Sequence, residues 1–173
     1  MGMDVYGKNA HTEQGEYFRN NVWYWRPLWG YCCEVHPDLC GNDADSGFMN
    51  DGYGLNEDDA TRLGHALLDD IETGRTEQYR LDYMAQLAEL PRTPCPHCGA
   101  TGIRTDAVGI DMGQHEKALS PEVASLVGRD FGWCNGCDGI GTQAHFAHNY
   151  PFVVENVKEF AEFLLVSGGF EIW

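Results

Sequence analysis

The chain has 173 residues, of which 43% are hydrophobic and 12% aromatic, and its formal net charge is −16. This apolar fraction excludes an intrinsically disordered chain, because such chains lack the surface whose burial offsets the entropy lost on ordering. The length suits one domain with its own core, or a domain joined to a small metal module, and the charge disfavours direct binding to the phosphate backbone of DNA or RNA.

The sequence shows neither a membrane segment nor a secretory signal. It has no run of about 18 apolar residues, which a membrane-spanning helix requires. Its opening, MGMDVYGKNA, lacks the basic start and the apolar stretch of a signal peptide. We therefore expect a cytoplasmic protein with no membrane partner. The seven cysteines agree with a reducing compartment, because a disulfide framework uses an even number.

The first predicted element is an aromatic-rich helix within residues 15–35, GEYFRNNVWYWRPLWGYCCEV. Four apolar residues recur there at spacings of four, three and four, namely Phe18, Val22, Trp25 and Trp29. This period predicts one apolar helical face. Pro27 is expected to kink or divide the helix, because proline lacks the backbone donor. We interpret the aromatic cluster as core rather than as a cofactor site.

A loop rich in Gly, Asn and Asp precedes two further predicted helices. Asn56 is expected to cap the first, at 57–73, and Gly74 to end it. The second is expected at 76–90, before Pro91. The short connection predicts an antiparallel helical hairpin. The residues expected to face inward from the first helix are Ala60, Leu63, Leu67 and Ile71.

Acidic residues are concentrated in the same part of the chain. From Glu34 to Glu77 there are twelve acids, against only Arg62 and Arg75. Net charge describes solubility more directly than fold, so a solvated face is the simplest interpretation. The alternative is an acidic surface for a basic protein partner, which could mimic nucleic acid.

We expect an α+β fold that is mostly helical and carries a zinc-knuckle insertion resembling a zinc ribbon. Three regions are predicted: a helical, aromatic-rich and acidic region at 1–93, a four-cysteine module at 94–142, and a C-terminal helix and tail at 143–173. The last region is expected to pack back on the helical core. Its helix should end at Gly168 and Gly169, followed by a short strand or tail.

Two pairs of cysteines occupy the predicted module. Cys95 and Cys98 belong to CPHCGATG, and Cys134 and Cys137 to CNGCDGIG. A Cys-x-x-Cys turn is short enough for two sulfurs to face one ion, and tetrahedral zinc takes four such donors. Glycines let the loops curl so that backbone N–H groups can reach the sulfurs. The pattern predicts one structural zinc, with a redox dithiol or a metal-free turn as alternatives.

The spacer between the two pairs is expected to contain a short helix of its own. Ser120 is followed by a proline and a glutamate, which is typical of a helix start with proline at the first helical position. Such a helix would fold the chain back and let the two pairs meet.

The second unit fits Cys-x-x-Cys-x-Gly-x-Gly, and so resembles the repeat of the cysteine-rich domain of DnaJ-type chaperones. In the first unit, Ala100 stands where that repeat has its first glycine, between Gly99 and Gly102. Two repeats hold one zinc in that family, so the resemblance implies a single zinc here. It does not extend to chaperone activity, because the sequence has no His-Pro-Asp motif.

The whole chain also resembles a group of small bacterial and prophage-encoded proteins. The shared features are the opening MGMDVYGKN, the stretch YFRNNVWYWRPLW, the paired knuckles and a closing SGGF. The group implies no activity. We expect a non-enzymatic interaction protein that binds a protein partner through its acidic helical face or through the knuckle loops. One version that fits a prophage setting is an acidic inhibitor that occupies the basic nucleic-acid channel of a host complex.

Other chemistry remains open at two places. A second metal site is conceivable from Cys32, His36 and Cys40, with His145 and His148. A small enzyme could instead use Cys32 or Cys33 as nucleophile with His36 as base.

A nucleic-acid-binding zinc module is the third hypothesis for function. Its region has three bases against six acids, so the net charge of the module disfavours it.

Overall fold

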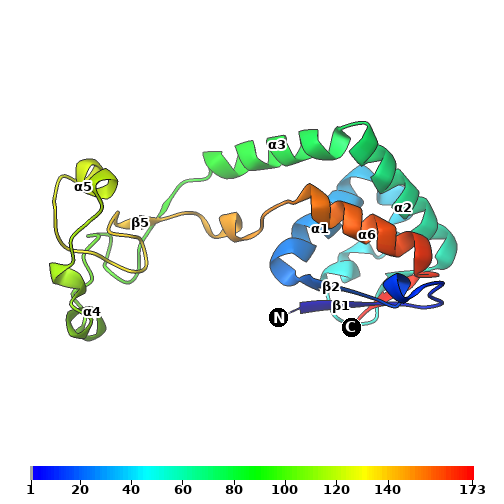
Figure 1. Cartoon of the computed structure of the whole chain (residues 1–173), viewed down its shortest axis with the longest axis horizontal. Coiled ribbons are helices and arrows are strands. Elements are labelled where there is room, and N and C mark those ends of the chain that lie inside the picture. The colour runs from blue at the N-terminus through cyan, green and yellow to red at the C-terminus, as the bar shows by residue number, and fades with distance from the viewer. Residues whose placement is uncertain (1) are drawn as a thin grey trace. The chain divides into compact units, whose positions relative to one another are not determined.

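The computed structural model describes residues 2–173. They form two compact units. Unit 1 contains the chain up to Ala88 together with Asn149–Trp173, and unit 2 is Glu89–His148. The expected four-cysteine module, 94–142, lies within unit 2. Helices combine with small antiparallel sheets, so the class is α+β (Figure 1). Among the described residues, no helix has the length and apolar character needed to cross a membrane.

Unit 1 contains a four-stranded antiparallel sheet with the order β2-β1-β6-β3. Its strands are β1 (Gly2–Gly7), β2 (Tyr17–Asn21), β3 (Gly54–Leu55) and β6 (Phe170–Ile172). Val5 in the central strand lies opposite Phe18 on one side and Ile172 on the other. Met3 and Val5 are buried and alternate with more exposed residues, as expected for a strand with one face on the core.

The helices of unit 1 are α1 (Val22–Val35), α2 (Glu57–Glu72), α3 (Arg75–Glu89, reaching the first residue of unit 2) and α6 (Val154–Val166). Helix α2 packs chiefly against α6. Gly64 permits the approach, because a Cβ atom there would lie only 3.0 Å from the carbonyl oxygen of Ala161. The predicted hairpin of α2 with α3 is therefore wrong: α3 turns away beyond Gly74, and the C-terminal helix takes the place beside α2 (Figure 1).

The predicted start of the aromatic helix is also wrong. Residues 17–21 form strand β2, and α1 begins only at Val22. Asn21 caps it, with its side chain accepting a hydrogen bond from the Trp23 amide at 2.9 Å. Pairing with β1 decides the outcome, because residues 2–7 supply a complete ladder of partners for 17–21. Pro27 lies inside α1 without dividing it.

Three aromatic side chains of α1, Trp25, Trp29 and Tyr31, lie in the core of unit 1, which confirms the interpretation for them, whereas Tyr24 is exposed. Trp25 and Trp29 are fully buried and stack at 5.8 Å between ring centroids. Their indole N–H groups donate to the carbonyl oxygens of Gly47 and Ala44, each at 2.8 Å. Gly47 is required there, because a Cβ atom would lie 2.2 Å from the indole nitrogen of Trp29. The loop after α1 thus supplies carbonyl acceptors for the indole N–H groups that are buried with the tryptophans.

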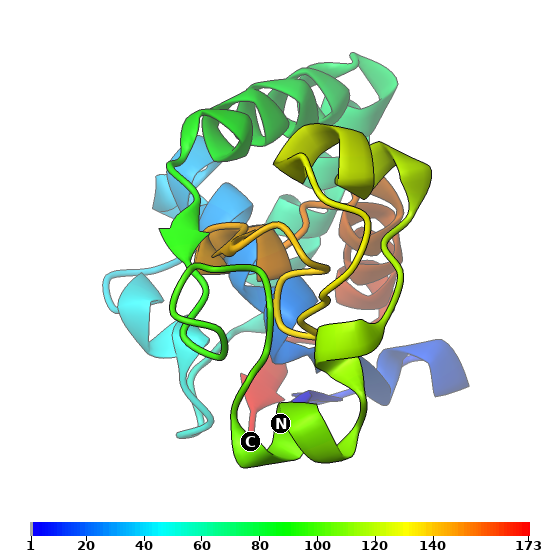
Figure 2. The same cartoon turned by 90° about the vertical axis from the view of Figure 1, so that its left-hand side faces the viewer.

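Unit 2 is built mainly of loops (Figure 2). Its regular elements are β4 (Thr93–Pro94), α4 (Ala107–Asp111), α5 (Pro121–Val127) and β5 (Thr142–Gln143), together with short 3₁₀ turns. The predicted start of α5 is confirmed: the Ser120 hydroxyl accepts from the Val123 amide. Gly128, with φ of 70°, ends the helix in the left-handed conformation.

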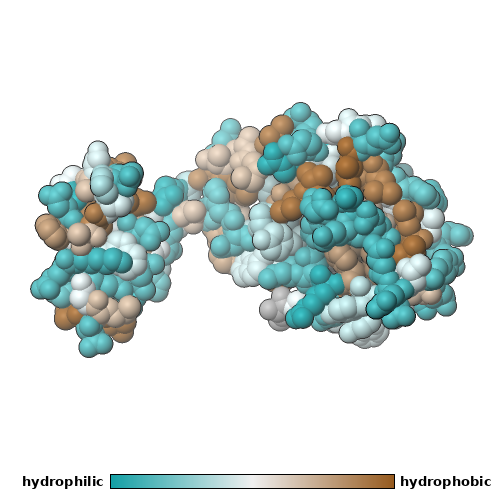
Figure 3. All heavy atoms as spheres, viewed as in Figure 1, coloured by the Kyte–Doolittle hydropathy of each residue, from teal (hydrophilic) through white to brown (hydrophobic). Residues whose placement is uncertain are grey.

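Among the described residues, the buried apolar cluster of unit 2 consists of the four module cysteines. Several large apolar side chains of this unit are exposed instead, namely Val108, Ile110, Met112, Leu126, Phe131 and Phe146. Hydrophilic and hydrophobic residues are correspondingly mixed on its surface (Figure 3). A unit with so little buried apolar surface needs another source of stability.

Candidate metal centre

The four cysteines of unit 2 converge at one point. Their sulfur atoms all lie within 4.8 Å of one another and could hold a metal ion. Sγ of Cys95 is 3.9 Å from that of Cys134, and Sγ of Cys98 is 3.7 Å from that of Cys137. A tetrahedral ion with metal–sulfur bonds of about 2.3 Å places its sulfurs about 3.8 Å apart. These separations therefore match the edges of a tetrahedral thiolate site and are far longer than a disulfide bond.

The two knuckles use the same backbone hydrogen bonds. In the first, Ala100 N donates to Cys95 O and Thr101 N to Cys98 O, at 3.2 and 3.1 Å. In the second, the equivalent bonds run from Gly139 N to Cys134 O and from Ile140 N to Cys137 O, at 3.3 and 2.9 Å. The equivalence shows that both turns have one geometry, although their sequences differ at most positions.

Each knuckle also supplies an amide donor to one of its own sulfurs. Gly102 N donates to Cys98 Sγ and Gly141 N to Cys137 Sγ, both at 3.2 Å. Such bonds favour the thiolate form, which is the form that binds metal. The donors come from the glycines that the sequence places four residues after the second cysteine of each pair.

The same glycines let the two knuckles lie against each other. A Cβ atom on Gly102 would lie 2.3 Å from the carbonyl oxygen of Gly139, and one on Gly141 would lie 2.4 Å from that of Ala100. Both glycines also have positive φ, 77° and 92°. Close backbone approach and left-handed conformation therefore exclude a larger residue at either position.

A short sheet and one arginine close the module around the sulfurs. Cys95 N donates to Gly141 O at 2.9 Å, next to the pairing of β4 with β5. The guanidinium of Arg129 donates to the carbonyl oxygens of Gly139 and Gly132, at 2.7 and 3.3 Å. The four cysteines are 0 to 9% exposed, so four protein donors surround the centre and leave little access for a substrate.

Ala100 is the position where the first knuckle departs from the glycine pattern, and it has a φ of 66°. A left-handed residue other than glycine costs about 1–2 kcal/mol. We expect Ala100→Gly to stabilise metal-loaded unit 2 by about 0.5–1 kcal/mol, the strain relieved less the entropy that glycine adds to the unfolded chain. Chemical denaturation followed by NMR signals of unit 2 measures the change.

The matched control is Ala124→Gly, the same replacement within right-handed helix α5. It should destabilise unit 2 by about 0.5–1 kcal/mol, because glycine is a poor helix former. Equal destabilisation by both substitutions would contradict the assignment of strain to Ala100.

Within neither unit do the residues considered for a second metal site form a group that could share an ion, among the residues that the structure describes. Cys32, His36 and Cys40 belong to unit 1, whereas His145 and His148 belong to unit 2. Among residues 2–173, the module cysteines form the one group of three or more metal-ligating side chains close enough to share an ion.

A cysteine nucleophile near His36 is disfavoured by its surroundings. Cys32 is fully buried, and this burial raises the pKa of its thiol well above the ordinary value. The lowered pKa of the half-buried Cys33 favours its thiolate, but the largest cause is a hydrogen bond with Cys40 rather than with His36. The base proposed for either thiol does not contact it: Nε2 of His36 lies 2.6 Å from a carboxylate oxygen of Asp70, and among the described residues no hydrogen bond joins the imidazole to Cys32 or Cys33. The cluster therefore lacks a thiol that is hydrogen-bonded to its proposed base.

Asp70 is a buried polar centre, although a solvated face was predicted for the acidic residues of this segment. It accepts hydrogen bonds from Tyr31 Oη at 2.7 Å and from Arg75 at 3.1 Å, in addition to its contact with His36. Thr76, also buried, lies 3.2 Å from the same tyrosine hydroxyl. The Asp69-Asp70 pair carries no local signal of this difference, since only tertiary packing buries the second carboxylate.

Comparison of the chain with protein-family models, with curated proteins and with solved structures finds no match. The fold and the site therefore define only a class: an α+β protein with a buried four-cysteine cluster that could hold a metal ion.

Proposed function

We propose that this is a non-enzymatic interaction protein in which one structural zinc holds unit 2 together and unit 1 binds a basic protein partner. The observation that carries the proposal is the distribution of charge. Unit 1 has twenty acids against seven bases, and unit 2 has seven against four. The acidic excess thus belongs mainly to the unit with the large core.

Zinc is the ion that best fits the donor set. Four thiolates in a tetrahedron select zinc or an iron–sulfur centre, and separations near 3.8 Å suit a single ion. A site closed by four protein ligands is structural, because catalytic zinc keeps a position open for water or substrate. The metal centre accordingly supports the fold, and we place the binding function on the surface.

The acids between Glu34 and Glu77 are available for such binding. Ten of the twelve are exposed, the exceptions being Asp59 and Asp70. The two bases of this segment are already paired, Arg62 with Asp59 at 3.4 Å and Arg75 with Asp70 at 3.1 Å. The remaining carboxylates therefore create a negative potential that the segment itself does not neutralise.

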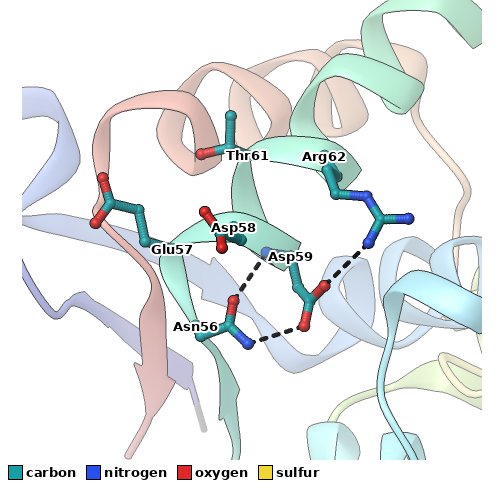
Figure 4. Close-up of a pocket in the computed structure, with 6 residues that line it drawn as sticks. All are labelled: Asn56, Glu57, Asp58, Asp59, Thr61 and Arg62. Carbon is teal, nitrogen blue, oxygen red and sulfur yellow. Dashed lines mark hydrogen bonds and ion pairs between the residues drawn. The ribbon is translucent and has the colours of Figure 1, made fainter.

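The start of α2 illustrates this surface (Figure 4). Asn56 caps the helix by accepting from the Asp59 amide, and it donates to the Asp59 carboxylate, each at 2.9 Å. The side chains of Glu57 and Asp58 extend from the same helical turn and point in other directions (Figure 4). Carboxylates are favoured here by the helix dipole, so the acidic surface is compatible with a stable fold.

A partner of this surface should carry a positive groove or tail, as proteins that bind nucleic acid do. A basic nucleic-acid channel of a host complex is the version of this partner that would suit a prophage setting. Unit 2 supports direct nucleic-acid binding poorly, because its own charge is also negative.

Affinity capture from the native host tests the proposal. We expect partners with strongly basic surfaces that are retained at about 0.05 M salt and released at about 0.5 M, because screening shortens the range of charge–charge attraction. Quantitative mass spectrometry of both fractions measures the release. A variant with four exposed acids neutralised, Asp38→Asn, Asp43→Asn, Asp45→Asn and Glu72→Gln, should retain less. Partners that are insensitive to both salt and charge would overturn the proposal.

A further inference from the structure

A small hollow lies between α1 and α3 on unit 1. Glu34 from α1 lines it, together with four residues from α3, namely Tyr79, Asp82, Tyr83 and Gln86. Its volume is about 160 Å³. Pockets for whole small-molecule ligands have about 300–1,000 Å³. The hollow therefore has room for the end of one side chain rather than for a cofactor or a segment of folded chain.

Two tyrosine rings provide its aromatic wall. The rings of Tyr79 and Tyr83, one helical turn apart, are within 17° of parallel with centroids 6.3 Å apart. Tyr79 also packs on Tyr31 and Phe152, at 4.7 and 4.9 Å between centroids. These contacts fix the ring of Tyr79 in place, so the wall is preformed.

Hydrogen bonds fix the tyrosine hydroxyls as well. Tyr79 donates to Glu34 at 2.9 Å, and Tyr83 donates to the carbonyl oxygen of Tyr150 at 2.7 Å. Both phenolic hydrogens are thus used within the fold. The two residues therefore present the electron-rich faces of neutral rings to a ligand, and such faces attract cations.

The hollow carries two exposed carboxylates and lacks a cation of its own. Among the described residues that line it, only Glu34 and Asp82 are charged. The bases of α3 are paired elsewhere, Arg80 with Glu77 at 2.6 Å and Arg75 with Asp70 at 3.1 Å. Aromatic surface next to unneutralised carboxylates is complementary to an organic cation.

We propose that this hollow binds the guanidinium group of an arginine side chain presented by the basic partner. The inference rests on the proposed function and names the chemistry of one contact within it. A guanidinium group is planar, so it can stack on a tyrosine ring while its N–H groups reach Glu34 and Asp82. A lysine ammonium has the charge but cannot stack or form a planar fork.

NMR titration of the full chain tests the site without a partner. The probe is N-acetyl-L-arginine amide, and the matched probe is the citrulline analogue, which has a similar shape and no charge. We expect saturable shifts of the Tyr79 and Tyr83 ring signals with the arginine probe. Affinity for the citrulline analogue should be at least about tenfold lower, because cation–π attraction and charge-assisted hydrogen bonds are lost.

The double variant Glu34→Gln/Asp82→Asn should lose the arginine-induced shifts while keeping its fold, because the amide oxygen introduced on α1 can still accept from Tyr79. The control, Glu13→Gln/Glu16→Gln, removes the same charge from exposed residues in and beside the 3₁₀ turn Glu13–Gly15, on the side of unit 1 away from α3 (Figures 1 and 2). It should bind as the native chain does.

Equal binding of the citrulline probe, of the lysine counterpart, or of arginine to the double variant would overturn the inference. The outcome is separable from that of affinity capture. If basic partners are captured in a salt-dependent way but the ring signals do not shift, the arginine site alone fails. If arginine binds but capture shows no dependence on charge, the proposed function fails and the hollow remains a guanidinium site.

Discussion

Removing the metal is expected to unfold unit 2 and leave unit 1 folded. The buried apolar cluster described for unit 2 is the four cysteines themselves, so in the zinc-bound protein that we propose the ion takes the place of a hydrophobic core. Structural zinc contributes about 10–16 kcal/mol to the folding of small zinc domains at neutral pH. Unit 1 has its own core of buried aromatic and aliphatic side chains, which does not depend on the ion.

Metal analysis, NMR and limited proteolysis test this expectation. The purified protein should contain about one zinc per chain. After chelation, amide signals from 89–148 should collapse to random-coil positions and proteolytic sites should open there. Signals from the core of α1 should stay dispersed.

Single substitutions at two cysteines provide the matched comparison. Cys137→Ser should reproduce the effect of chelation, because serine is a poor replacement for a thiolate ligand. Cys33→Ser, in unit 1 and outside the cluster, should retain the zinc. Metal-free protein in which 89–148 remains protected would show that the site is not structural. Absence of zinc from folded protein with four freely titrating thiols would refute the metal centre itself.

Replacing Asp70 with alanine should destabilise unit 1 by about 3–5 kcal/mol. The carboxylate is 2% exposed and accepts from the side chains of Tyr31, His36 and Arg75. Its removal takes a charged acceptor away from the buried Tyr31 and the largely buried His36, and it opens a small cavity between α1 and the end of α2. Loss of one member of a buried charged network has this order of cost, because the remaining groups stay desolvated.

The neighbouring acid supplies the control for that measurement. Asp69 follows the same helix but is exposed, so Asp69→Ala should change stability by less than about 0.5 kcal/mol. Tyr31→Phe should fall between the two, since it removes the hydroxyl that contacts Asp70 and Thr76 but keeps the ring packed on Tyr79. Equal unfolding free energies for the Asp69 and Asp70 variants, from chemical denaturation of unit 1, would contradict a supporting role for the buried network.

The two expected effects separate the sources of stability in the chain. We expect unit 2 to depend on metal coordination, and unit 1 to depend on packed aromatic rings and on a small number of satisfied buried polar groups. Functional variants of the acidic surface should affect neither, because the residues they change are exposed. Stability and binding can therefore be measured independently in the same protein.

Local chemistry in the sequence was sufficient to predict several elements. The caps at Asn56 and Ser120 and the stop at Gly74 are each encoded within about four residues, because a helix end is satisfied by its nearest neighbours. The spacing within each Cys-x-x-Cys-glycine unit likewise identified the residues that the structure brings together, because one turn positions two sulfurs.

Only the tertiary structure decided the features that join distant segments. Strand β1 was not predicted, and its pairing places residues 17–21 in a strand rather than in the expected helix. Helix α2 packs on α6 rather than on its neighbour in sequence, and Asp70 differs from Asp69 only because α1 covers it. Sequence patterns describe a residue's nearest neighbours along the chain. Whether a residue is buried or paired depends on which distant segments of the chain pack beside it. The free energy of the whole packed unit determines which segments these are.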